Sequence, residues 1–557
     1  MKKHILYAIP LFASCLIASC SDWDDHFNNA GSGEAGSNAT LWQMIKSDPQ
    51  LSNFAQVLEE TKVFRQHKKT SVSYADLLDG GQSFTVVAPV NESLNDEYRD
   101  SLLAMVQTAQ GDSVVEKSFI FNHLSRSLSS VTPQDKDKQV LLLNTKYADF
   151  EGGKIEGISM LSPNQRAKNG MLHIAEEPIP YERNLYEMLC DKAELTPIGV
   201  VLRSYEEDYF DADQSVSSGI VEGVPIYVDS VIIERNKMLN VLGYLNREDS
   251  LYLVAAPTKD EWNRVWDETS KYFNYDTKVN KRDSLQQHWT MRALMEDAVF
   301  NVTLNPWYAE AKESEALASL DSLTSVPYHR PPSNYQKPVY HVFHKPFGTD
   351  GILANAREVQ CSNGVIYEMD EWTYDPLKTF FRQLWVEAEY NSNIMEYKSC
   401  YYNTRRLVAD SISEYGYLQI LHEKATSNWE MTFRIDNTLS ANYDICAIVL
   451  PRTVAYPDET FKPCKFKATI NYVDEKGTSQ TFNCNNTEFE TDPARIDTVV
   501  LAENFHFPAA NYSTNEIKVS VKLKCAISTR ETAKYSREMY LDCIYLRPRT
   551  DVEDSEE

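Results

Sequence analysis

Glu387 and Glu389 are separated by one residue at the end of an apolar and aromatic run that begins at Leu384. Side chains two residues apart on a β-strand point to the same face of the sheet, so the two carboxylates can share a cation. Ca²⁺ prefers hard oxygen ligands, and the pair therefore predicts a structural calcium ion. A strand face that is simply solvated explains the same spacing and stays open as an alternative.

Motifs for catalysis are absent from the sequence. It contains no GxSxG nucleophile elbow, HExxH zinc motif, phosphate-binding loop or dinucleotide fingerprint. His123 and His173 lie in apolar segments, where a histidine is usually a hydrogen-bonded core residue. His341 and His344 lie in a strand-like run that points their rings to opposite faces, so they cannot chelate one metal ion. We assign no catalytic residue.

Three short landmarks occur twice, in the same order. Each set contains a helical opening, an apolar strand that ends in Ala-Pro, and a strand introduced by Asn-Gly. The first set is Leu41–Ile45, Phe84–Pro89 and Asn169–His173, and the second is Leu185–Leu189, Leu251–Pro257 and Asn363–Tyr367. Proline ends each apolar strand, and Asn91 is expected to cap the helix that follows the first. Repetition in order predicts a duplicated domain.

The first set of landmarks resembles the fasciclin-type domain. The resemblance is carried by Phe84–Leu94 (FTVVAPVNESL), by Asn122-His123-Leu124 and by Asn169–Pro180 (NGMLHIAEEPIP). The second set departs from this pattern, because Phe300-Asn301-Val302 lacks the histidine and Tyr367–Asp370 replaces the closing His-containing block. The resemblance spans about residues 40 to 375 and implies two α+β domains of a class that acts in adhesion.

Beyond Asp375-Pro376 the helical periodicity gives way to short β-branched and aromatic runs separated by turn residues. Such spacing predicts an antiparallel sandwich or jelly roll over residues 380–550. Two segments, Trp385–Glu389 and Tyr540–Pro548, resemble the first and last strands of carbohydrate-binding jelly rolls. This resemblance implies that a saccharide ligand binds the C-terminal sandwich rather than the fasciclin-type pair.

Aromatic faces stack on the C–H surfaces of sugars, so exposed rings near strand ends or turns are candidates for ligand contact. The candidates in the C-terminal region are Tyr401, Tyr402, Tyr415, Tyr417, Trp429 and Tyr443. Most aromatic residues of a domain lie in its core, and we expect at most two or three of these to touch ligand.

The N-terminus is typical of an exported protein. Lys2 and Lys3 precede an apolar run, Ile5–Ala18, that is too short to span a membrane but suits a signal peptide. The run ends in Ile17-Ala18-Ser19-Cys20, which resembles a bacterial lipobox and implies that Cys20 is acylated. The acidic residues of Ser21–Phe27 resemble the signal that sends lipoproteins of the Bacteroides group to the cell surface. An ordinary cleavable signal is the alternative.

The charge balance, 81 acidic against 55 basic residues in 557, argues against nucleic acid as a partner. It also argues against electrostatic binding to an anionic membrane, so the lipid must be the anchor. Apart from Cys15 of the signal and Cys20, eight of the ten cysteines remain, and none has the CxxC spacing of a zinc site. Disulfides and buried thiols both remain open.

The sequence thus predicts a multidomain chain, with two α+β fasciclin-like domains followed by an all-β, jelly-roll-like sandwich. Its expected parts are a signal peptide (1–19), lipidated Cys20 with a flexible tether (20–39), fasciclin-like domain 1 (40–182), fasciclin-like domain 2 with insertions (183–375), the sandwich (380–550) and an acidic tail (551–557). One insertion, near Glu206 to Val228, is expected to be a solvated acidic loop.

We expect a lipid-anchored protein of the outer membrane that faces the cell exterior and binds a glycan or a surface protein without catalysis. Possible calcium is the one cofactor expected. An outer-membrane transporter of a polysaccharide uptake system is the expected partner complex. A glycan hydrolase without a recognisable motif is the alternative function.

Overall fold

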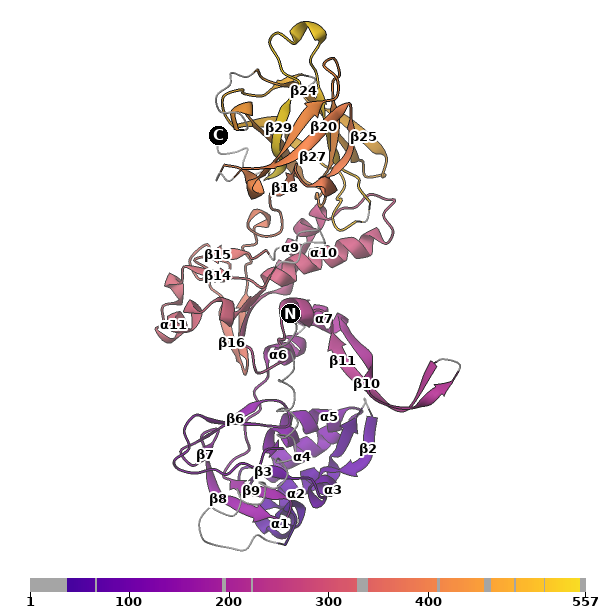
Figure 1. Ribbon diagram of the computed structural model, residues 1–557. Helices are drawn as coiled ribbons and strands as arrows, with labels where there is room; N and C mark the ends of the chain where they lie inside the picture. Colours follow the sequence, from indigo (N-terminus) through magenta and orange to yellow (C-terminus); the bar gives the residue numbers. More distant parts are fainter. Residues whose placement is uncertain are drawn as a thin grey trace, which may run out of the picture. The chain divides into compact units, whose positions relative to one another are not determined.

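The computed structural model describes residues 38–65, 68–192, 197–221, 224–327, 339–407, 411–454, 462–484, 487–514 and 516–550 (Figure 1). The chain divides into two compact units, residues 1–181 and 182–557, here called unit 1 and unit 2. Both helices and several separate sheets are present, so the protein is multidomain and of mixed α and β structure. The expected signal peptide, lipidated Cys20 and acidic tail lie outside the described residues.

Unit 1 packs short helices against a mixed sheet. The helices are α1 (Leu41–Ser47), α2 (Ser52–Glu60), α3 (Tyr74–Asp79), α4 (Asp96–Val106) and α5 (Gly111–Val115). The sheet has the strand order β4-β3-β9-β8-β7-β6-β5, with β3 (Phe84–Pro89), β4 (Leu124–Ser125), β5 (Lys138–Leu141), β6 (Tyr147–Glu151), β7 (Lys154–Ile155), β8 (Ile158–Ala167) and β9 (Gly170–Ala175). A separate hairpin joins β1 (Lys62–Arg65) to β2 (Lys68–Ser73).

Strand β3 is buried on both faces, which explains its uninterrupted apolar sequence. Phe84, Val86 and Ala88 pack with the helices, whereas Val87 packs in a second cluster with residues of β5, β6 and β7. Strand β9 runs parallel to β3, and Phe84 pairs with Gly170. A Cβ on Gly170 would overlap the carbonyl oxygen of Phe84, so this close approach requires glycine.

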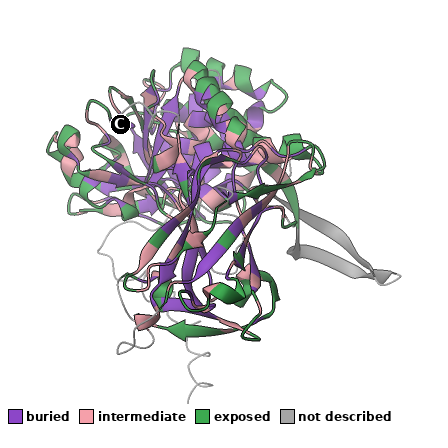
Figure 2. Cartoon of the chain, turned by 90° about the horizontal axis from the view of Figure 1, so that it is seen from above, coloured by how far each residue is buried: buried purple, intermediate pink, exposed green. Residues whose placement is uncertain are grey.

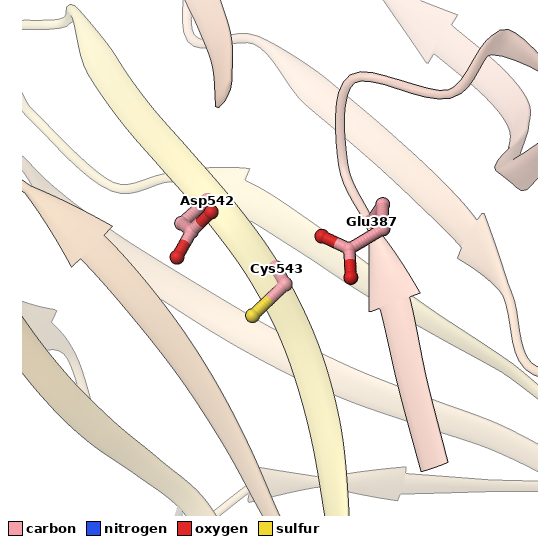
Figure 3. A group of neighbouring side chains, drawn as sticks. All are labelled: Glu387, Asp542 and Cys543. Carbon is pink, nitrogen blue, oxygen red and sulfur yellow. The ribbon is translucent and has the colours of Figure 1, made fainter. Parts of the chain in front are cut away.

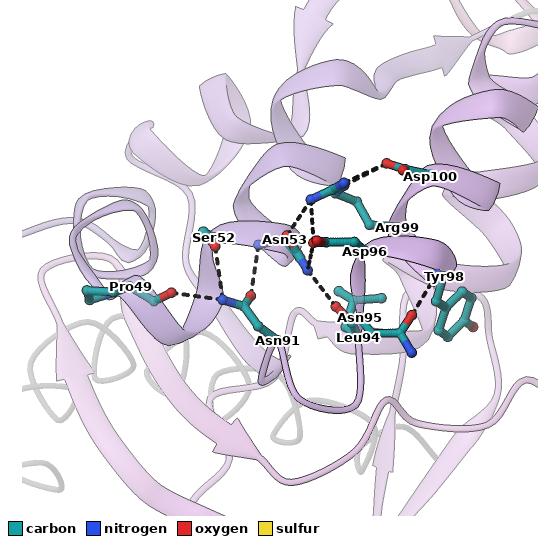
Figure 4. A network of polar contacts seen from close by, with 10 residues as sticks. All are labelled: Pro49, Ser52, Asn53, Asn91, Leu94, Asn95, Asp96, Tyr98, Arg99 and Asp100. Atoms are coloured by element: carbon teal, nitrogen blue, oxygen red, sulfur yellow. Dashed lines mark hydrogen bonds and ion pairs between the residues drawn. The ribbon is translucent and has the colours of Figure 1, made fainter.

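Asn91 does not cap α4, the helix that follows β3, contrary to the sequence-based expectation. Its side-chain oxygen accepts the backbone N–H of Asn53 at 2.9 Å, and its Nδ2 donates to the carbonyl of Pro49 at 2.8 Å (Figure 4). The cap of α4 is Asn95, whose side chain accepts the N–H of Tyr98 at 2.9 Å. Asn91 lies in the turn Val90–Leu94, which separates β3 from α4. From this turn its side chain forms hydrogen bonds at the start of α2.

His123 and His173 are fully buried, as their apolar sequence neighbours predict. Nδ1 of His123 lies 2.7 Å from the carbonyl of Phe119, and its Nε2 accepts the N–H of Ile179 at 3.0 Å. These contacts require the neutral ring with its proton on Nδ1. Burial lowers the pKa of His123 to about 4, so the ring is neutral at physiological pH.

The first part of unit 2 repeats the landmarks of unit 1. It contains the helices α6 (Leu185–Asp191), α7 (Pro197–Ser204), α8 (Leu239–Leu242), α9 (Lys259–Tyr272), α10 (Arg282–Asp297) and α11 (Trp307–Glu313). Its sheet has the order β13-β12-β17-β16, with β12 (Tyr252–Pro257), β13 (Val299–Asn301), β16 (Arg357–Cys361) and β17 (Gly364–Met369). A small sheet pairs β14 (Ser322–Thr324) with β15 (Val342–His344).

The two repeats share hydrogen bonds as well as topology. β12 and β17 are parallel with Tyr252 opposite Gly364, as β3 and β9 are in unit 1. Asn169 accepts the N–H of Leu41 at 2.8 Å, and Asn363 accepts the N–H of Leu185 at the same distance. The Asn-Gly pair therefore anchors the opening helix to the closing strand in both repeats, and the duplication inferred from the sequence is present in the fold.

The insertion near Glu206 to Val228 is not a loop. It belongs to a long antiparallel hairpin of β10 (Glu206–Val221) and β11 (Val224–Asn236). At its base the guanidinium of Arg235 lies 3.4 Å from the ring centroid of Tyr209. The acidic residues of β10 are typical of a solvated loop, so the sequence did not indicate that β10 is a strand. The β-branched run of β11, with which it pairs, has strong β propensity.

The C-terminal part of unit 2 consists of two antiparallel sheets. The first has the path β20-β21-β29-β23-β27, with β18 paired to β29, and the second has the path β19-β22-β28-β24-β25, with β26 paired to β24. The strands are β18 (Leu384–Glu387), β19 (Ile394–Lys398), β20 (Cys400–Arg406), β21 (Gly416–His422), β22 (Glu430–Arg434), β23 (Asn442–Leu450), β24 (Lys465–Val473), β25 (Ser479–Asn483), β26 (Phe489–Glu490), β27 (Asp497–His506), β28 (Ser520–Cys525) and β29 (Met539–Arg549).

One hydrophobic core joins these two sheets to helices of the preceding part of unit 2. Figure 2 marks the buried residues of the chain in purple. Phe273 is fully buried, and its ring centroid lies 5.3 Å from those of both Phe380 and Tyr512. Trp289 of α10 also contacts Tyr512, with 5.1 Å between ring centroids. The sandwich therefore shares its core with the segment that follows α9 and with α10.

Candidate functional site

A cluster of carboxylates lies where β18 and β29 pair. Glu387 is opposite Cys543 in this ladder, and Asp542 precedes Cys543. The ligand atoms of Glu387, Asp542 and Cys543 all lie within 4.8 Å of one another (Figure 3). Glu387 is 7% exposed and Asp542 is fully buried. The cluster thus holds two carboxylates away from bulk water.

Several oxygens of this cluster lack hydrogen-bond partners. Glu387 accepts the hydroxyl of Ser413 at 2.6 Å, and Asp542 accepts the backbone N–H of Ser413 at 3.3 Å. The second carboxylate oxygens of both residues are buried without a partner, as is one oxygen of Glu389. Buried carboxylate oxygens are costly unless they are hydrogen-bonded or bind a cation.

The raised pKa values of these carboxyl groups also favour a bound cation. Burial, together with the charges of Glu387, Asp542 and Glu414, raises the pKa of Glu389 to about 7. Burial and the charge of Glu387 raise the pKa of Asp542 to about 7 as well, and burial raises the pKa of Glu387. A hard divalent cation removes this repulsion, and carboxylate oxygens fit Ca²⁺. Burial also raises the pKa of the Cys543 thiol.

Sequence reasoning found Glu387 and Glu389 but missed Asp542. The strand ends at Glu387, so Glu389 lies in the following segment instead of on the same strand face. It is not among the three residues whose ligand atoms lie within 4.8 Å of one another. The signal for Asp542 was an acidic residue inside the apolar run Met539–Leu546. Only the pairing of the first strand with the last brings it next to Glu387.

The segment Ser413–Gly416, here called the Ser413 turn, closes the cluster on one side. Glu414 and Tyr415 have positive φ angles of 47° and 58°, a conformation that side chains rarely adopt. A Cβ on Gly416 would overlap the carboxylate of Glu389. A strained backbone conformation persists where neighbouring contacts hold it in place. Here the contacts of Ser413 with Glu387 and Asp542 hold the turn.

The structure separates the six aromatic candidates into exposed and buried residues. Tyr401 is 62% exposed and Tyr415 is 47% exposed, whereas Tyr402 is partly buried against the core of the sandwich. These three stay candidates for ligand contact.

The other three aromatic candidates have no face available to a ligand, which corrects the prediction for them. Trp429 is fully buried and its Nε1 donates to the carbonyl of Arg537 at 2.7 Å. Tyr443 is 1% exposed, and its hydroxyl accepts the N–H of Leu439 at 3.1 Å. Tyr417 is 4% exposed and packs in a small cluster with Tyr540.

A pocket of 610 Å³ opens at the edge of the sandwich where the chain passes from β19 to β20. We call it the β20 pocket. Its lining residues are Asn391, Tyr397, Cys400, Tyr401, Tyr402, Asn403, Thr404 and Arg405. The ring of Tyr397, which is 52% exposed, packs edge-on against Tyr402 with 5.0 Å between centroids. Tyr397 was missed because β19 is an exposed edge strand without a clear apolar face.

The polar side of the pocket is fixed by neighbouring strands. Nδ2 of Asn403 and Nε of Arg405 donate to Oε1 of Gln419 at 3.4 and 3.3 Å. Gln419 in turn donates to the hydroxyl of Tyr540 at 3.2 Å. Asn391, which lines one wall of the pocket, lies two residues after Glu389 in the chain.

Comparison with solved structures gives partial matches at low TM-score. No protein-family model matches the sequence. No curated protein matches it either. A FAS1 domain pair from the insect cell adhesion molecule fasciclin I matches with a TM-score of 0.19 and 12% identity, over 53% of this chain and 90% of that chain. The xylan-binding domain of CBM 22 matches with a TM-score of 0.18 and 9% identity, over 29% of this chain and 92% of that one.

The CBM22-1-GH10 modules of Clostridium thermocellum xylanase 10B, complexed with xylohexaose, match with a TM-score of 0.20 and 8% identity. The match covers 30% of this chain and 29% of that chain, so this protein spans less than a third of the xylanase modules.

Within the described residues we find no helix long and apolar enough to cross a bilayer.

Proposed function

We propose that this protein is a non-catalytic glycan-binding or adhesion protein whose ligand occupies the β20 pocket. The observation that carries the proposal is the pair of exposed tyrosines, Tyr397 and Tyr401, beside amide and guanidinium groups on fixed β-strands. Sugars are bound by such combinations of aromatic faces and polar side chains, and a strand scaffold holds the groups in place. The fasciclin-like pair serves as a spacer or a second adhesion module.

Replacing Tyr401 with Ala tests this assignment. Removal of the most exposed ring of the pocket should weaken binding to the glycan found on an array about tenfold, which corresponds to about 1.4 kcal/mol of lost stacking. Tyr147→Ala is the matched control, because Tyr147 is 46% exposed on β6 of unit 1. Isothermal titration of the full chain measures both. Equal affinities of the Tyr401→Ala variant and the unchanged protein would remove the pocket from the proposal.

We propose that Cys20, outside the described residues, carries the lipid that anchors the protein to the outer membrane, facing the exterior. The lipobox-like run before Cys20 supports this anchor. An outer-membrane transporter of a polysaccharide uptake system is the proposed partner. Cys20→Ala should move the protein from the membrane pellet to the soluble fraction. Retention in the pellet with unchanged electrophoretic mobility would contradict the anchor.

We propose in addition that the cluster of Glu387, Glu389 and Asp542 holds a structural Ca²⁺. Three buried carboxylate oxygens without partners support this site. A bound cation would supply positive charge to the cluster, and the Ser413 turn would close over it. The segment from Glu389 to Asn391, which leads to the β20 pocket, would then be held at one end by the same ion.

A further inference from the structure

The β20 pocket contains a cation and no carboxylate. Among its eight lining residues Arg405 is the charged one, and none is Asp or Glu. The chain as a whole carries 81 acidic and 55 basic residues. The one lining charge is therefore opposite in sign to the net charge of the chain, −26.

Arg405 is held in place without being neutralised. Its Nε donates to the neutral amide oxygen of Gln419, and within the described part of the chain it forms no ion pair. Two arginines of β29 in the same sheet are neutralised: Arg547 and Arg549 both contact the buried carboxylate of Asp444, at 2.6 and 2.8 Å. The outer edge of the Arg405 guanidinium remains available for a bidentate oxyanion.

Strand geometry places Arg405 on the same face of β20 as the exposed ring of Tyr401. Tyr401, Asn403 and Arg405 alternate along β20 and therefore lie on one face, with about 13 Å between the ends of the row. A short oligosaccharide can stack on Tyr401, hydrogen-bond to Asn403 and place a substituent against Arg405. Arg406, the next residue of β20, does not line the pocket.

We propose that the β20 pocket selects acidic glycans, in which a carboxylate or sulfate substituent contacts Arg405. The inference rests on the proposed glycan-binding function and adds the chemical class of the ligand. Both substituents present oxyanions that a guanidinium binds through paired hydrogen bonds. The tyrosines contribute to the affinity for any stacked sugar, whereas Arg405 discriminates the charged from the neutral ligand.

The test uses the full chain with Cys20→Ala for solubility. Polygalacturonate, its carboxyl-reduced form and a sulfated galactan are titrated at low and at high salt. We expect at least one acidic polymer to bind ten times more tightly than the neutral form, with an advantage that shrinks as salt rises. Arg405→Gln should abolish this advantage, and Arg406→Gln, which removes the same charge beside the pocket, should preserve it.

Polygalacturonate and the sulfated galactan distinguish a carboxylate ligand from a sulfate ligand. Tight binding of either polymer alone supports the inference. Equal binding of the acidic and neutral polymers, or an Arg405→Gln variant with unchanged selectivity, overturns the acidic-glycan inference and leaves glycan binding intact. Failure of every acidic polymer, while a neutral array glycan still binds, overturns it too. Loss of all glycan binding, on the array and in solution, instead removes the proposed function. Thermal melting of each variant confirms that it is folded.

Discussion

Adding calcium to protein that has been treated with a chelator is expected to stabilise unit 2. A ligand that binds only the folded state adds about 4 kcal/mol to the free energy of unfolding when its free concentration is roughly a thousand times its Kd. For a unit of this size that corresponds to a rise in melting temperature on the order of 8 °C. The cause is the buried cluster of Glu387, Glu389 and Asp542, whose unpartnered oxygens repel one another without a cation. Differential scanning calorimetry with and without calcium measures the shift.

The Asp542→Asn variant should respond in the opposite way. The amide removes one buried charge, so the metal-free variant should melt higher than the metal-free parent, and added calcium should raise its melting temperature little. Glu503→Gln is the matched control, because Glu503 is an exposed carboxylate on β27 of the same sandwich and should leave the calcium response unchanged. A calcium shift in Asp542→Asn as large as in the parent protein would place the ion elsewhere.

The duplicated scaffold could be predicted from sequence because its landmarks have strict local requirements. β3 and β12 are buried on both faces and therefore appear as continuous apolar runs. The Asn-Gly pairs at Gly170 and Gly364 are needed where two strands approach too closely for a Cβ. Such constraints act within a few residues, so they remain visible in the sequence without knowledge of the tertiary structure.

The candidate site was harder to predict because it depends on pairing between distant segments. Asp542 reaches Glu387 only through the β18–β29 ladder, across about 150 residues of intervening chain. Alternation along a strand separates its two faces but does not say which face a second sheet covers. For that reason Trp429 and Tyr443 had the same sequence signature as Tyr401, although they lie in the core.

The shared core has a practical consequence for unit 2. A fragment limited to residues 380–550 would lack Phe273 and Trp289, which pack against Phe380 and Tyr512 of the sandwich region. It would also lack Asp276, whose buried carboxylate forms an ion pair with Lys518. Removing one partner of a buried pair leaves an uncompensated charge. Binding measurements therefore require the full chain.

Phe273→Ala should destabilise both parts of unit 2 together, because the ring fills a core that they share. Truncation of a fully buried phenylalanine costs about 3–5 kcal/mol through lost burial and the cavity left behind. Hydrogen–deuterium exchange should then accelerate in peptides of β12 and β17 and, to a similar degree, in peptides of β23 and β29. Trp307→Ala is the control, because that side chain is 71% exposed on α11 and should change exchange little. If the β23 and β29 peptides keep their original protection while those of β12 and β17 lose theirs, the sandwich folds independently of the shared core.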